Sequence, residues 1–529
     1  MRHSRLLKLI LLVSMAGFMI PVGASAESLQ EQPMAFGGKG ITNVKQVAAG
    51  YASTLALKND GTVWAWGGNL TTRLTTAAVQ VPGLSDVESI TYSSAYADTA
   101  AVVKKDGTAW MLGYLRYGTF DGVTYSSNNT LFTSVPKQIE GLQDVEDIQF
   151  GYNAAFALKK DGTVWAWGSN EYGELGNGQV KTLAAPALVA GLPPITAIHS
   201  DGITAFAIDK NGKLWYWGSP YWYYYQTGKQ AVVTKPRLFD KLDHIKAISS
   251  SGSATLLLRS DGTVWSFGDN YGGVLGRSKD PLEGPIHLEQ IPELQSIEEL
   301  SCSYLQCLAL DELDHVWVWG NNSYRQIGDG LQPHRFDHPV KLAHQQAVKV
   351  VSGFRTSFLI KKDGTLWGAG LNGEGQIGRG LLGAWGGEEG FGVPPYSYEP
   401  YSWGTFSVTK YEPVLEAPRV AVNGKQIAMW SMQIDGTVYA SVRGIMEALG
   451  YRMTWNPTDK IAVALKDGKE FAFHTEETGG IYKNGQSIAV GKEVYNVRGE
   501  LLAPVRELGS AFGWTTVWEP ERYTIHVTE

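Results

Sequence analysis

One phrase recurs seven times along the chain, and its period constrains the fold more than any other feature. The phrase is an apolar strand, a turn, a second strand ending in Asp-Gly, and a third strand that carries tryptophan. Clear copies read VKQVAAGYASTLALKNDGTVWAWG from Val44, VEDIQFGYNAAFALKKDGTVWAWG from Val145, IKAISSSGSATLLLRSDGTVWSFG from Ile245 and VKVVSGFRTSFLIKKDGTLWGAG from Val348. Weaker copies begin at Val87, Ile195 and Ile297. The mean spacing is about fifty residues, and such periods are typical of propellers and solenoids.

Each unit predicts four short strands. Asp-Gly or Asn-Gly between alternating apolar strands is a strong hairpin signal, because both turn residues must accept positive φ. Two tryptophans placed two residues apart, such as Trp64 and Trp66, project from one face of a strand. A fourth apolar stretch follows each tryptophan strand, usually around a proline, which suits an edge strand. Four strands per unit without a helical period describe a propeller blade, so the fold class is mainly β.

The loops after the tryptophan strands carry a more specific pattern. They read GSNEYGELG from Gly168 and GLNGEGQIG from Gly370, and they resemble the regulator of chromosome condensation repeat family. The resemblance implies a seven-bladed propeller over residues 44–418. Since no strand precedes the first unit within residues 27–43, which we interpret as a linker, we expect Glu412–Leu415 to close the ring within the blade of Val44–Gly67.

The first twenty-six residues have the composition of a secretory signal peptide. Arg2, Arg5 and Lys8 precede an apolar stretch from Leu9 to Ile20, and Ala24-Ser25-Ala26 offers a cleavage site. No other apolar run approaches a membrane span. Removal of this segment takes the net charge from −7 to about −10, so the basic footprint of a nucleic-acid-binding protein is missing. We expect a secreted or cell-envelope-associated protein.

Two cysteines, Cys302 and Cys307, flank the turn between the first two strands of the sixth unit. A disulfide across this turn is one interpretation in an exported protein. Other units place small residues, such as Ala49 and Thr54, at the matching positions. We therefore favour two small buried residues.

A different duplication begins after Pro418. Asn423-Gly424-Lys425 opens one copy and Asn484-Gly485-Gln486 opens another, and each copy leads to an Arg, a Gly and a Trp at matching spacing. Ser441 can cap a helix ending at Gly450, and Pro504 can occupy the first turn of a helix ending at Gly513. Residues 419–529 thus predict an α+β domain built from two copies of strands, one helix and a tryptophan strand.

This region resembles the copper amine oxidase N-terminal domain. The resemblance does not extend to copper chemistry, because Tyr495-Asn496 has the wrong order for a quinone precursor and only His474 and His526 are present. We assign no metal site here and interpret the domain as an attachment or spacer module.

No motif in the chain predicts an enzyme. The spelling Gly373-x-Gly375-x-x-Gly378 matches a dinucleotide fingerprint, but it opens no helix and coincides with the repeat. Two carboxylate pairs, Glu171/Glu174 and Glu388/Glu389, lie in loops and are interpreted as solvated charge. The histidines lack metal-ligand spacing. We therefore predict no catalytic residue, no metal and no cofactor.

Two aromatic-rich loops are the candidate binding residues. The stretch WYWGSPYWYYY from Trp215 ends in five aromatics outside the repeat, and residues 385–406 are similarly rich. Exposed aromatic side chains mark contact sites, although the same rings can also pack over a blade edge. The candidates are Tyr221, Trp222, Tyr223, Tyr224, Tyr225, Trp385, Tyr398 and Trp403.

These observations predict an exported, non-enzymatic binding or scaffold protein whose propeller face engages a protein or a cell-envelope polymer. Similar propellers include a secreted bacterial inhibitor of β-lactamase, which makes protein binding a reasonable expectation. The alternatives are guanine-nucleotide exchange, the activity for which the repeat family is named, and a carbohydrate-active enzyme of the cell envelope. The oligomeric state is left open.

Overall fold

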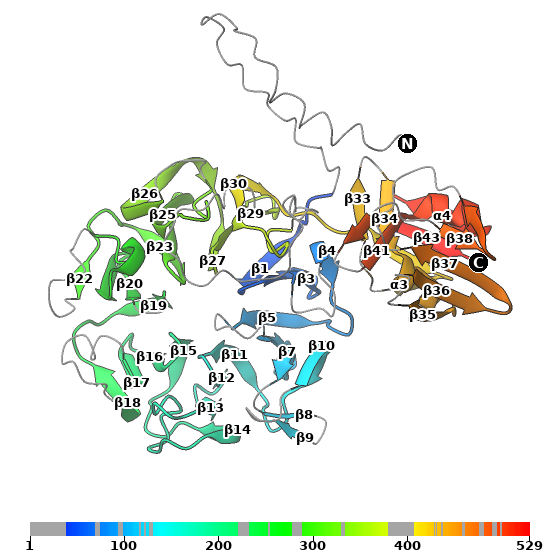
Figure 1. The fold of residues 1–529 in the computed structure, drawn as a ribbon. Coiled ribbons are helices and arrows are strands. Elements are labelled where there is room, and N and C mark those ends of the chain that lie inside the picture. Colours follow the sequence, from blue (N-terminus) through cyan, green and yellow to red (C-terminus); the bar gives the residue numbers. More distant parts are fainter. Residues whose placement is uncertain are drawn as a thin grey trace, which may run out of the picture. The chain divides into compact units, whose positions relative to one another are not determined.

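The computed structural model describes residues 39–529 except for 69–74, 94–98, 116–117, 121–122, 126–130, 221–231, 252–253, 278–287, 329–333, 379–406, 428, 430, 435–436, 457–460, 475–480, 489–494 and 498–499. Within the described ranges, seven four-stranded antiparallel sheets lie around a common axis (Figure 1). The fold class predicted from the repeats, a seven-bladed β-propeller with a smaller C-terminal α+β part, is confirmed. In the described chain, none of the helices has the length and apolarity that a membrane crossing requires.

Each sheet corresponds to one repeat, with its first strand nearest the axis. The strands of the first four sheets are β1 (Val44–Ala49), β2 (Ser53–Lys58), β3 (Val63–Gly67), β4 (Thr75–Gln80); β5 (Val87–Tyr92), β6 (Thr99–Lys104), β7 (Ala109–Leu115), β10 (Leu131–Gln138); β11 (Val145–Phe150), β12 (Ala154–Lys159), β13 (Val164–Gly168), β14 (Leu183–Leu188); β15 (Ile195–Ser200), β16 (Thr204–Asp209), β17 (Leu214–Gly218) and β18 (Val233–Phe239). A hairpin of β8 (Gly118–Phe120) and β9 (Val123–Tyr125) is inserted in the second blade.

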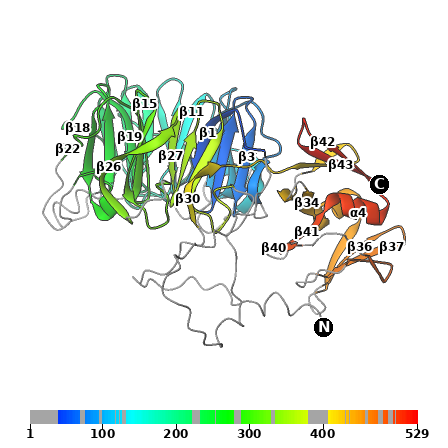
Figure 2. The same cartoon turned by 90° about the horizontal axis from the view of Figure 1, so that it is seen from above.

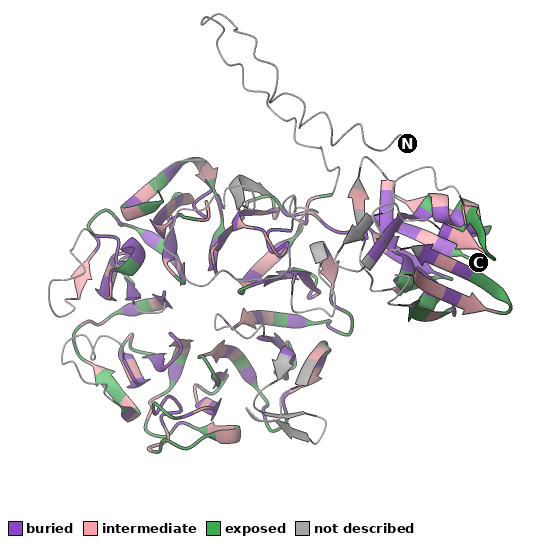
Figure 3. Ribbon diagram, in the orientation of Figure 1, coloured by how far each residue is buried: buried purple, intermediate pink, exposed green. Residues whose placement is uncertain are grey.

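The other three sheets contain β19 (Ile245–Ser250), β20 (Ala254–Arg259), β21 (Val264–Gly268), β22 (Glu289–Gln290); β23 (Ile297–Ser303), β24 (Gln306–Asp311), β25 (His315–Asn321), β26 (Arg335–Gln346); β27 (Lys349–Gly353), β28 (Thr356–Ile360), β29 (Leu366–Leu371) and β30 (Ser407–Pro413). A single turn of 3-10 helix, η1 (Tyr271–Gly273), follows β21. The second strand of each blade is buried along nearly its whole length, as Figure 3 shows by colour.

The propeller has two faces of different composition. Seen edge-on in Figure 2, the strands run between the two sides of the disc. Because consecutive strands are antiparallel, the Asp-Gly turns between the second and third strands share one side, which we name the Asp-Gly face. The turns between the first and second strands share the opposite side with the loops after the third strands. We name this side the aromatic face.

The Asp-Gly turns fix the first tryptophan of each third strand. In the third blade, Asp161 Oδ1 accepts hydrogen bonds from the backbone N and the Oγ1 of Thr163, at 2.9 and 2.6 Å. Thr163 Oγ1 in turn accepts from Trp165 Nε1 at 3.3 Å. The same relay recurs in the turns of Asp60, Asp106, Asp261 and Asp363. The sequence Asp-Gly-Thr-x-Trp is therefore a local hydrogen-bonded unit.

In the first, fourth and sixth blades the second tryptophan joins neighbouring blades. Trp66 Nε1 donates to the carbonyl oxygen of Gln376 at 2.8 Å, and Trp217 and Trp319 donate in the same way to Glu174 and Val274 of the preceding blade. Each acceptor lies in the loop that follows a third strand. An asparagine shapes this loop, as when Asn170 Oδ1 accepts from Leu175 N at 2.9 Å. The glycine-rich loops thus present carbonyl groups to the next blade.

Ring closure differs from the strand pairing expected from the sequence. Glu412 pairs with Gly368 in the seventh blade, so β30 is an ordinary fourth strand and not a strand of the first blade. The junction of the seventh and first blades uses the same bonds as the others, including Val44 N to the Gly364 carbonyl at 3.1 Å. A closing strand is unnecessary because the repeat contacts already join the two blades.

The residues flanking the propeller reinforce this junction. Ile41, in the segment interpreted as a linker, is fully buried and donates its N–H to the Val414 carbonyl at 2.8 Å. Leu415 and Ala417 exchange backbone hydrogen bonds with Ala78 of β4. The ammonium group of Lys58 pairs with Glu416, and both side chains are nearly buried. Residues 39–43 therefore belong to the propeller.

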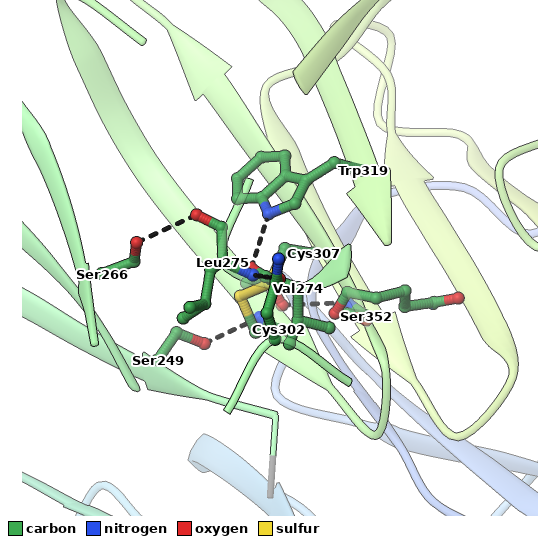
Figure 4. Close-up of a disulfide and its surroundings, with 11 residues drawn as sticks. Ser249, Ser266, Val274, Leu275, Cys302, Cys307, Trp319 and Ser352 are labelled. Carbon is green, nitrogen blue, oxygen red and sulfur yellow. Dashed lines mark hydrogen bonds between the residues drawn. A yellow bond between two sulfur atoms is a disulfide. The ribbon is translucent and has the colours of Figure 1, made fainter. Parts of the chain in front are cut away.

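The structure confirms that both cysteines are buried, but it corrects the interpretation that they are unpaired. Cys302 on β23 and Cys307 on β24 form a disulfide, and they are directly paired across the two strands (Figure 4). Cys302 N donates to Ser249 Oγ of the fifth blade at 2.7 Å, and Trp319 next to the disulfide donates to Val274. The disulfide therefore lies at the junction of the fifth and sixth blades.

The C-terminal part is an interleaved α+β unit. Its strands are β31 (Arg419–Val422), β32 (Lys425–Ile427), β33 (Ser431–Ile434), β34 (Thr437–Ser441), β35 (Arg452–Asn456), β36 (Ile461–Lys466), β37 (Lys469–His474), β38 (Ile481–Lys483), β39 (Gln486–Ile488), β40 (Tyr495–Val497), β41 (Glu500–Pro504), β42 (Thr515–Glu519) and β43 (Thr524–Thr528). The first copy pairs with the second, β34 with β41 and β31 with β43. One hydrophobic core serves both copies.

The two helices of this unit confirm the predicted signals. Helix α3 (Val442–Ala448) begins after Ser441, whose Oγ accepts from Gly444 N at 2.9 Å. Helix α4 (Val505–Phe512) ends at Gly513, which has a φ of 78°. Pro504 is the residue that precedes α4 and does not lie within its first turn. Trp455 on β35 and Trp518 on β42 follow the helices, as the duplication predicted.

Candidate functional site

Three adjacent blades bring aromatic rings together on the aromatic face. Tyr304, Phe354 and Tyr51 occupy the turns between the first and second strands of the sixth, seventh and first blades. The Phe354 ring centroid lies 4.3 Å from that of Tyr304 and 4.6 Å from that of Tyr51. Tyr51 and Tyr304 nevertheless remain 39% and 36% exposed. These rings, with Tyr324 and Arg355, are named the Arg355 cluster.

Arg355 is surrounded by the rings of this cluster. Its guanidinium carbon lies 4.3 Å from the ring centroid of Tyr324, 4.7 Å from Phe354 and 5.4 Å from Tyr304. Such contacts attract a cation to the face of an aromatic ring. The backbone places the side chain there through a left-handed φ of 61° at Arg355, and Tyr304 has the same conformation with a φ of 53°.

The charge of Arg355 is not neutralised within the described residues. Its Nε is enclosed and has no hydrogen-bond acceptor there, and none of the ion pairs between described side chains includes its guanidinium group. An enclosed donor without an acceptor costs free energy, and the cost is larger for a charged group. The guanidinium group of Arg355 therefore has no counter-charge among the described residues.

A polar cavity opens beside the cluster along the propeller axis. Its volume is about 740 Å³, and the first strand of every blade lines it. Tyr304 and Phe354 are part of its lining, so the Arg355 cluster borders its mouth. Several polar side chains of the lining hold blades together: Ser249 Oγ accepts from Cys302 N at 2.7 Å, and Ser301 Oγ accepts from Ser352 N at 2.9 Å.

Burial suppresses charge within the cavity wall. It lowers the pKa of His199 to about 4 and raises the pKa of Asp201 to about 7. Burial also raises the pKa of Glu299, against the opposing influence of Lys349. The cavity wall thus favours neutral forms of its imidazole and carboxyl groups, whereas Arg355 at its mouth carries a permanent charge.

Further exposed rings extend the aromatic face. Tyr152 occupies the first turn of the third blade, and Tyr172 and Tyr271 lie in the loops after β13 and β21. Tyr271 is 55% exposed. The Tyr152 ring covers Gly202 of the next blade so closely that a Cβ there would lie 2.8 Å from it. The face therefore carries aromatic side chains on several blades.

All eight aromatic residues predicted from the sequence lie outside the described residues: Tyr221, Trp222, Tyr223, Tyr224, Tyr225, Trp385, Tyr398 and Trp403. Their loops follow the third strands β17 and β29, so both leave the propeller at the aromatic face. The prediction that they bind a partner stays a prediction.

The described site consists of residues that sequence reasoning missed. Among the first turns that the structure describes, four carry an aromatic residue, at Tyr51, Tyr152, Tyr304 and Phe354. This signal was visible in the aligned repeats, but three of these turns become neighbours only when the ring closes. Among the carboxylates considered, Glu174 Oε2 accepts from Tyr172 N at 2.7 Å and so shapes its own loop. Glu388 and Glu389 lie outside the described residues.

The described residues do not gather three His, Cys, Asp or Glu side chains in an arrangement that could hold a metal ion. His526 of the C-terminal unit approaches Glu519 instead, with 3.0 Å between Nε2 and Oε2.

Comparison with known families agrees with this architecture. Family models of the regulator of chromosome condensation (RCC1) repeat match residues 44–70, 145–174, 245–273 and 347–376, and another matches residues 161–200. The copper amine oxidase N-terminal domain matches residues 421–527. The chain carries RCC1 repeats and a copper amine oxidase N-terminal domain. Each match coincides with the part of the sequence that showed the resemblance.

Curated relatives share only part of the chain. It is 28% identical over 104 residues to the probable E3 ubiquitin-protein ligase HERC4 of Rattus norvegicus, which covers 19% of this chain and 10% of that protein. It is 28% identical over 169 residues to the ultraviolet-B receptor UVR8 of Arabidopsis thaliana, covering 30% and 36% respectively. The chain thus spans about a tenth to a third of the length of these relatives.

A similar solved structure is the crystal structure of Kap60 bound to yeast RCC1. The match has a TM-score of 0.50 and 19% identity, and it covers 59% of this chain and 78% of that chain. At this identity the likeness shows the fold.

Proposed function

We propose that this chain is an exported binding protein without catalytic activity, whose aromatic face engages a partner protein. The observation that carries the proposal is the Arg355 cluster. Its rings pack around a cation that lacks an acceptor for its Nε among the described residues, and two of them, Tyr51 and Tyr304, remain accessible. Tyrosine and arginine are enriched at the centres of protein interfaces, where a few such residues supply most of the binding free energy.

Two further observations support this function. One solved structure similar to this chain is that of yeast RCC1 bound to Kap60, so a protein that contains this fold binds another protein. Export rests on residues 1–26, whose charge and apolar pattern are those of a signal peptide. An exported chain meets partners outside the cytoplasm, which argues against exchange activity on a cytosolic GTPase.

The aromatic cluster can be tested with a double variant. Tyr51 and Tyr304 each keep more than a third of their surface exposed, so burial of one ring by a partner contributes about 1–2 kcal/mol. We expect Tyr51→Ser/Tyr304→Ser to weaken binding about thirtyfold to a thousandfold. The measurement is retention of secreted and cell-wall proteins of the source organism by the immobilised mature chain.

The matched control is Trp455→Ser in the C-terminal unit, where the indole is 47% exposed. It removes an exposed aromatic ring from a different part of the chain and should leave retention unchanged. Equal retention by the double variant and the native chain would contradict the proposal. Retention of a glycan polymer in place of a protein would contradict the proposal that the partner is a protein.

The loops predicted from the sequence need a separate variant. Changing Trp222, Tyr223 and Tyr224 together to serine should abolish retention if this loop extends the binding surface. The melting temperature distinguishes a contact role from a packing role, because removing rings that pack over a blade edge would lower the melting temperature. Lost binding with an unchanged melting temperature supports a contact role.

A further inference from the structure

Arg355 has an environment that a purely structural arginine does not need. Three rings lie within 5.4 Å of its guanidinium carbon, and its Nε is enclosed without an acceptor among the described residues. The side chain as a whole is half-buried. Arginine presents a planar fork of donors that matches a carboxylate through two parallel hydrogen bonds. The rings therefore fix the plane of the guanidinium group, and its two Nη groups are the donors left for a partner.

The chemistry of the cluster selects one kind of occupant. Three aromatic rings flank the guanidinium group, and a charged pair that forms beside them is less solvated and therefore stronger than one in open water. A polyanion such as a phosphate polymer requires a row of cations, and the net charge of about −10 expected after removal of residues 1–26 disfavours it. A single carboxylate next to apolar groups would pair with the guanidinium charge, and the apolar groups would pack against the rings.

We propose that Arg355 anchors an aspartate or glutamate side chain of the partner protein, held against Tyr304, Tyr324 and Phe354 at the mouth of the axial cavity. The inference rests on the proposed function and names the chemistry of its central contact. In this role Arg355 determines specificity, because a partner with an amide in place of the acid leaves the guanidinium charge without a counter-ion.

The test uses short random peptides displayed on phage and selected on the immobilised mature chain. We expect the enriched peptides to share an acidic residue. In a synthetic, terminally blocked copy of an enriched peptide, replacement of the acid by its amide should weaken binding to the native chain about tenfold to a hundredfold. The same replacement should have little effect on the Arg355→Gln variant, since the partner of the acid is then missing.

Two further variants separate charge from structure. Lys160→Gln removes a positive charge from an exposed position on the Asp-Gly face and should bind the peptide like the native chain. Arg355→Lys keeps the charge without the planar fork, so we expect an affinity between those of the native chain and Arg355→Gln. If Arg355→Gln lowers the melting temperature, Arg355→Lys takes its place in the comparison with the native chain.

The outcomes distinguish this inference from the function on which it rests. Two results would overturn the role of Arg355 alone. One is that the enriched peptides bind without an acid. The other is that the amide replacement weakens binding to Arg355→Gln as much as it weakens binding to the native chain. Peptides that bind Tyr51→Ser/Tyr304→Ser as tightly as the native chain overturn the aromatic face as well. A selection that enriches no peptide on the native chain also contradicts the inference.

Discussion

The two faces of the propeller differ in how closely their turns repeat the same residues from blade to blade. On the Asp-Gly face, five described turns use the same relay from aspartate through threonine to tryptophan. On the aromatic face, the matching turns carry Tyr51, Tyr152, Gly202, Tyr304 and Phe354. The regular face fixes the blades, whereas the residues in the turns of the aromatic face differ from blade to blade. Loops on a rigid scaffold are where binding residues concentrate.

Two blades show how strongly the regular face preserves its chemistry. The fourth and sixth units lack threonine after the turn, yet their tryptophans keep an acceptor. Trp215 Nε1 donates to Asp209 Oδ2 at 3.2 Å, and Trp317 Nε1 donates to Asp311 Oδ2 at 3.1 Å. Where the other units have lysine or arginine at the end of the second strand, these two have aspartate. A different residue therefore supplies the same hydrogen bond.

The largest effect is expected where the repeat joins the last blade to the first. Trp66 is 1% exposed and donates to Gln376 across this junction, so Trp66→Ala should lower the free energy of unfolding by about 3–5 kcal/mol. Trp66→Phe keeps most of the volume. The Gln376 carbonyl still accepts from Thr54 Oγ1 at 3.0 Å, and we expect a loss of about 1–2 kcal/mol. Urea unfolding of the mature chain measures both.

Trp319→Ala at the junction of the fifth and sixth blades is the comparison, because its indole makes the same contact with Val274. Similar losses at the two junctions are expected if the ring closes by repeat contacts alone. A much smaller loss for Trp66→Ala would show that the segment of Ile41 and Val414 holds the first and seventh blades together without it.

The second prediction concerns the cavity wall. The pKa of Asp201 is about 7 in the folded chain, against 3.8 for the ordinary carboxyl. Between these values the folded chain binds the extra proton, so this group makes stability fall as pH rises, by at most about 1.4 kcal/mol per pH unit. Asp201→Asn keeps an oxygen for Thr204 N, which lies 2.9 Å from Oδ1. It should therefore be more stable than the native chain at pH 8 and lose this advantage toward pH 4.

His199 in the same wall acts in the opposite direction. Its pKa of about 4 in the folded chain lies below the ordinary 6.5, so it makes stability rise with pH between those values. Glu299 and Lys349 also line the cavity. For this reason the measured quantity is the difference between the native chain and Asp201→Asn across the pH range. A difference that does not change with pH would show that Asp201 is not buried as described.

The sequence predicted the regular features because their chemistry is local. Asp-Gly turns, paired tryptophans and the signals at Ser441 and Gly513 each act within a few residues, so the blades and helices could be derived without the fold. The glycine-rich loops were recognised as part of the repeat. Their role, to offer carbonyl groups such as that of Gln376 to the next blade, required the structure.

The errors arise where residues far apart in the chain meet. The pairing of Glu412 was assigned to the first blade because a missing strand was assumed, whereas the seventh blade is complete without that assumption. Cys302 and Cys307 were interpreted as small core residues, yet they face each other as a directly paired position of two strands. The Arg355 cluster draws on three blades. No single repeat contains it.

The smallest effect is expected on the Asp-Gly face, and its pH dependence has the sign opposite to that of Asp201. Hydrogen bonds from the Thr163 hydroxyl and then from its backbone N hold the pKa of Asp161 below the ordinary 3.8. The ionised carboxylate therefore stabilises the fold above about pH 4, and this contribution is lost as pH falls through the folded pKa. Asp161→Asn keeps an acceptor without its charge. We expect the variant to be slightly less stable than the native chain at pH 7 and equal to it at pH 2. Thr163→Ala removes the hydroxyl that bridges Asp161 and Trp165. Loss of the hydrogen bond from the indole should lower stability at both pH values, and loss of the hydrogen bond to the ionised carboxylate should lower it further only at pH 7. If Asp161→Asn were as destabilising at pH 2 as at pH 7, the turn would depend on shape and not on the charge of its aspartate.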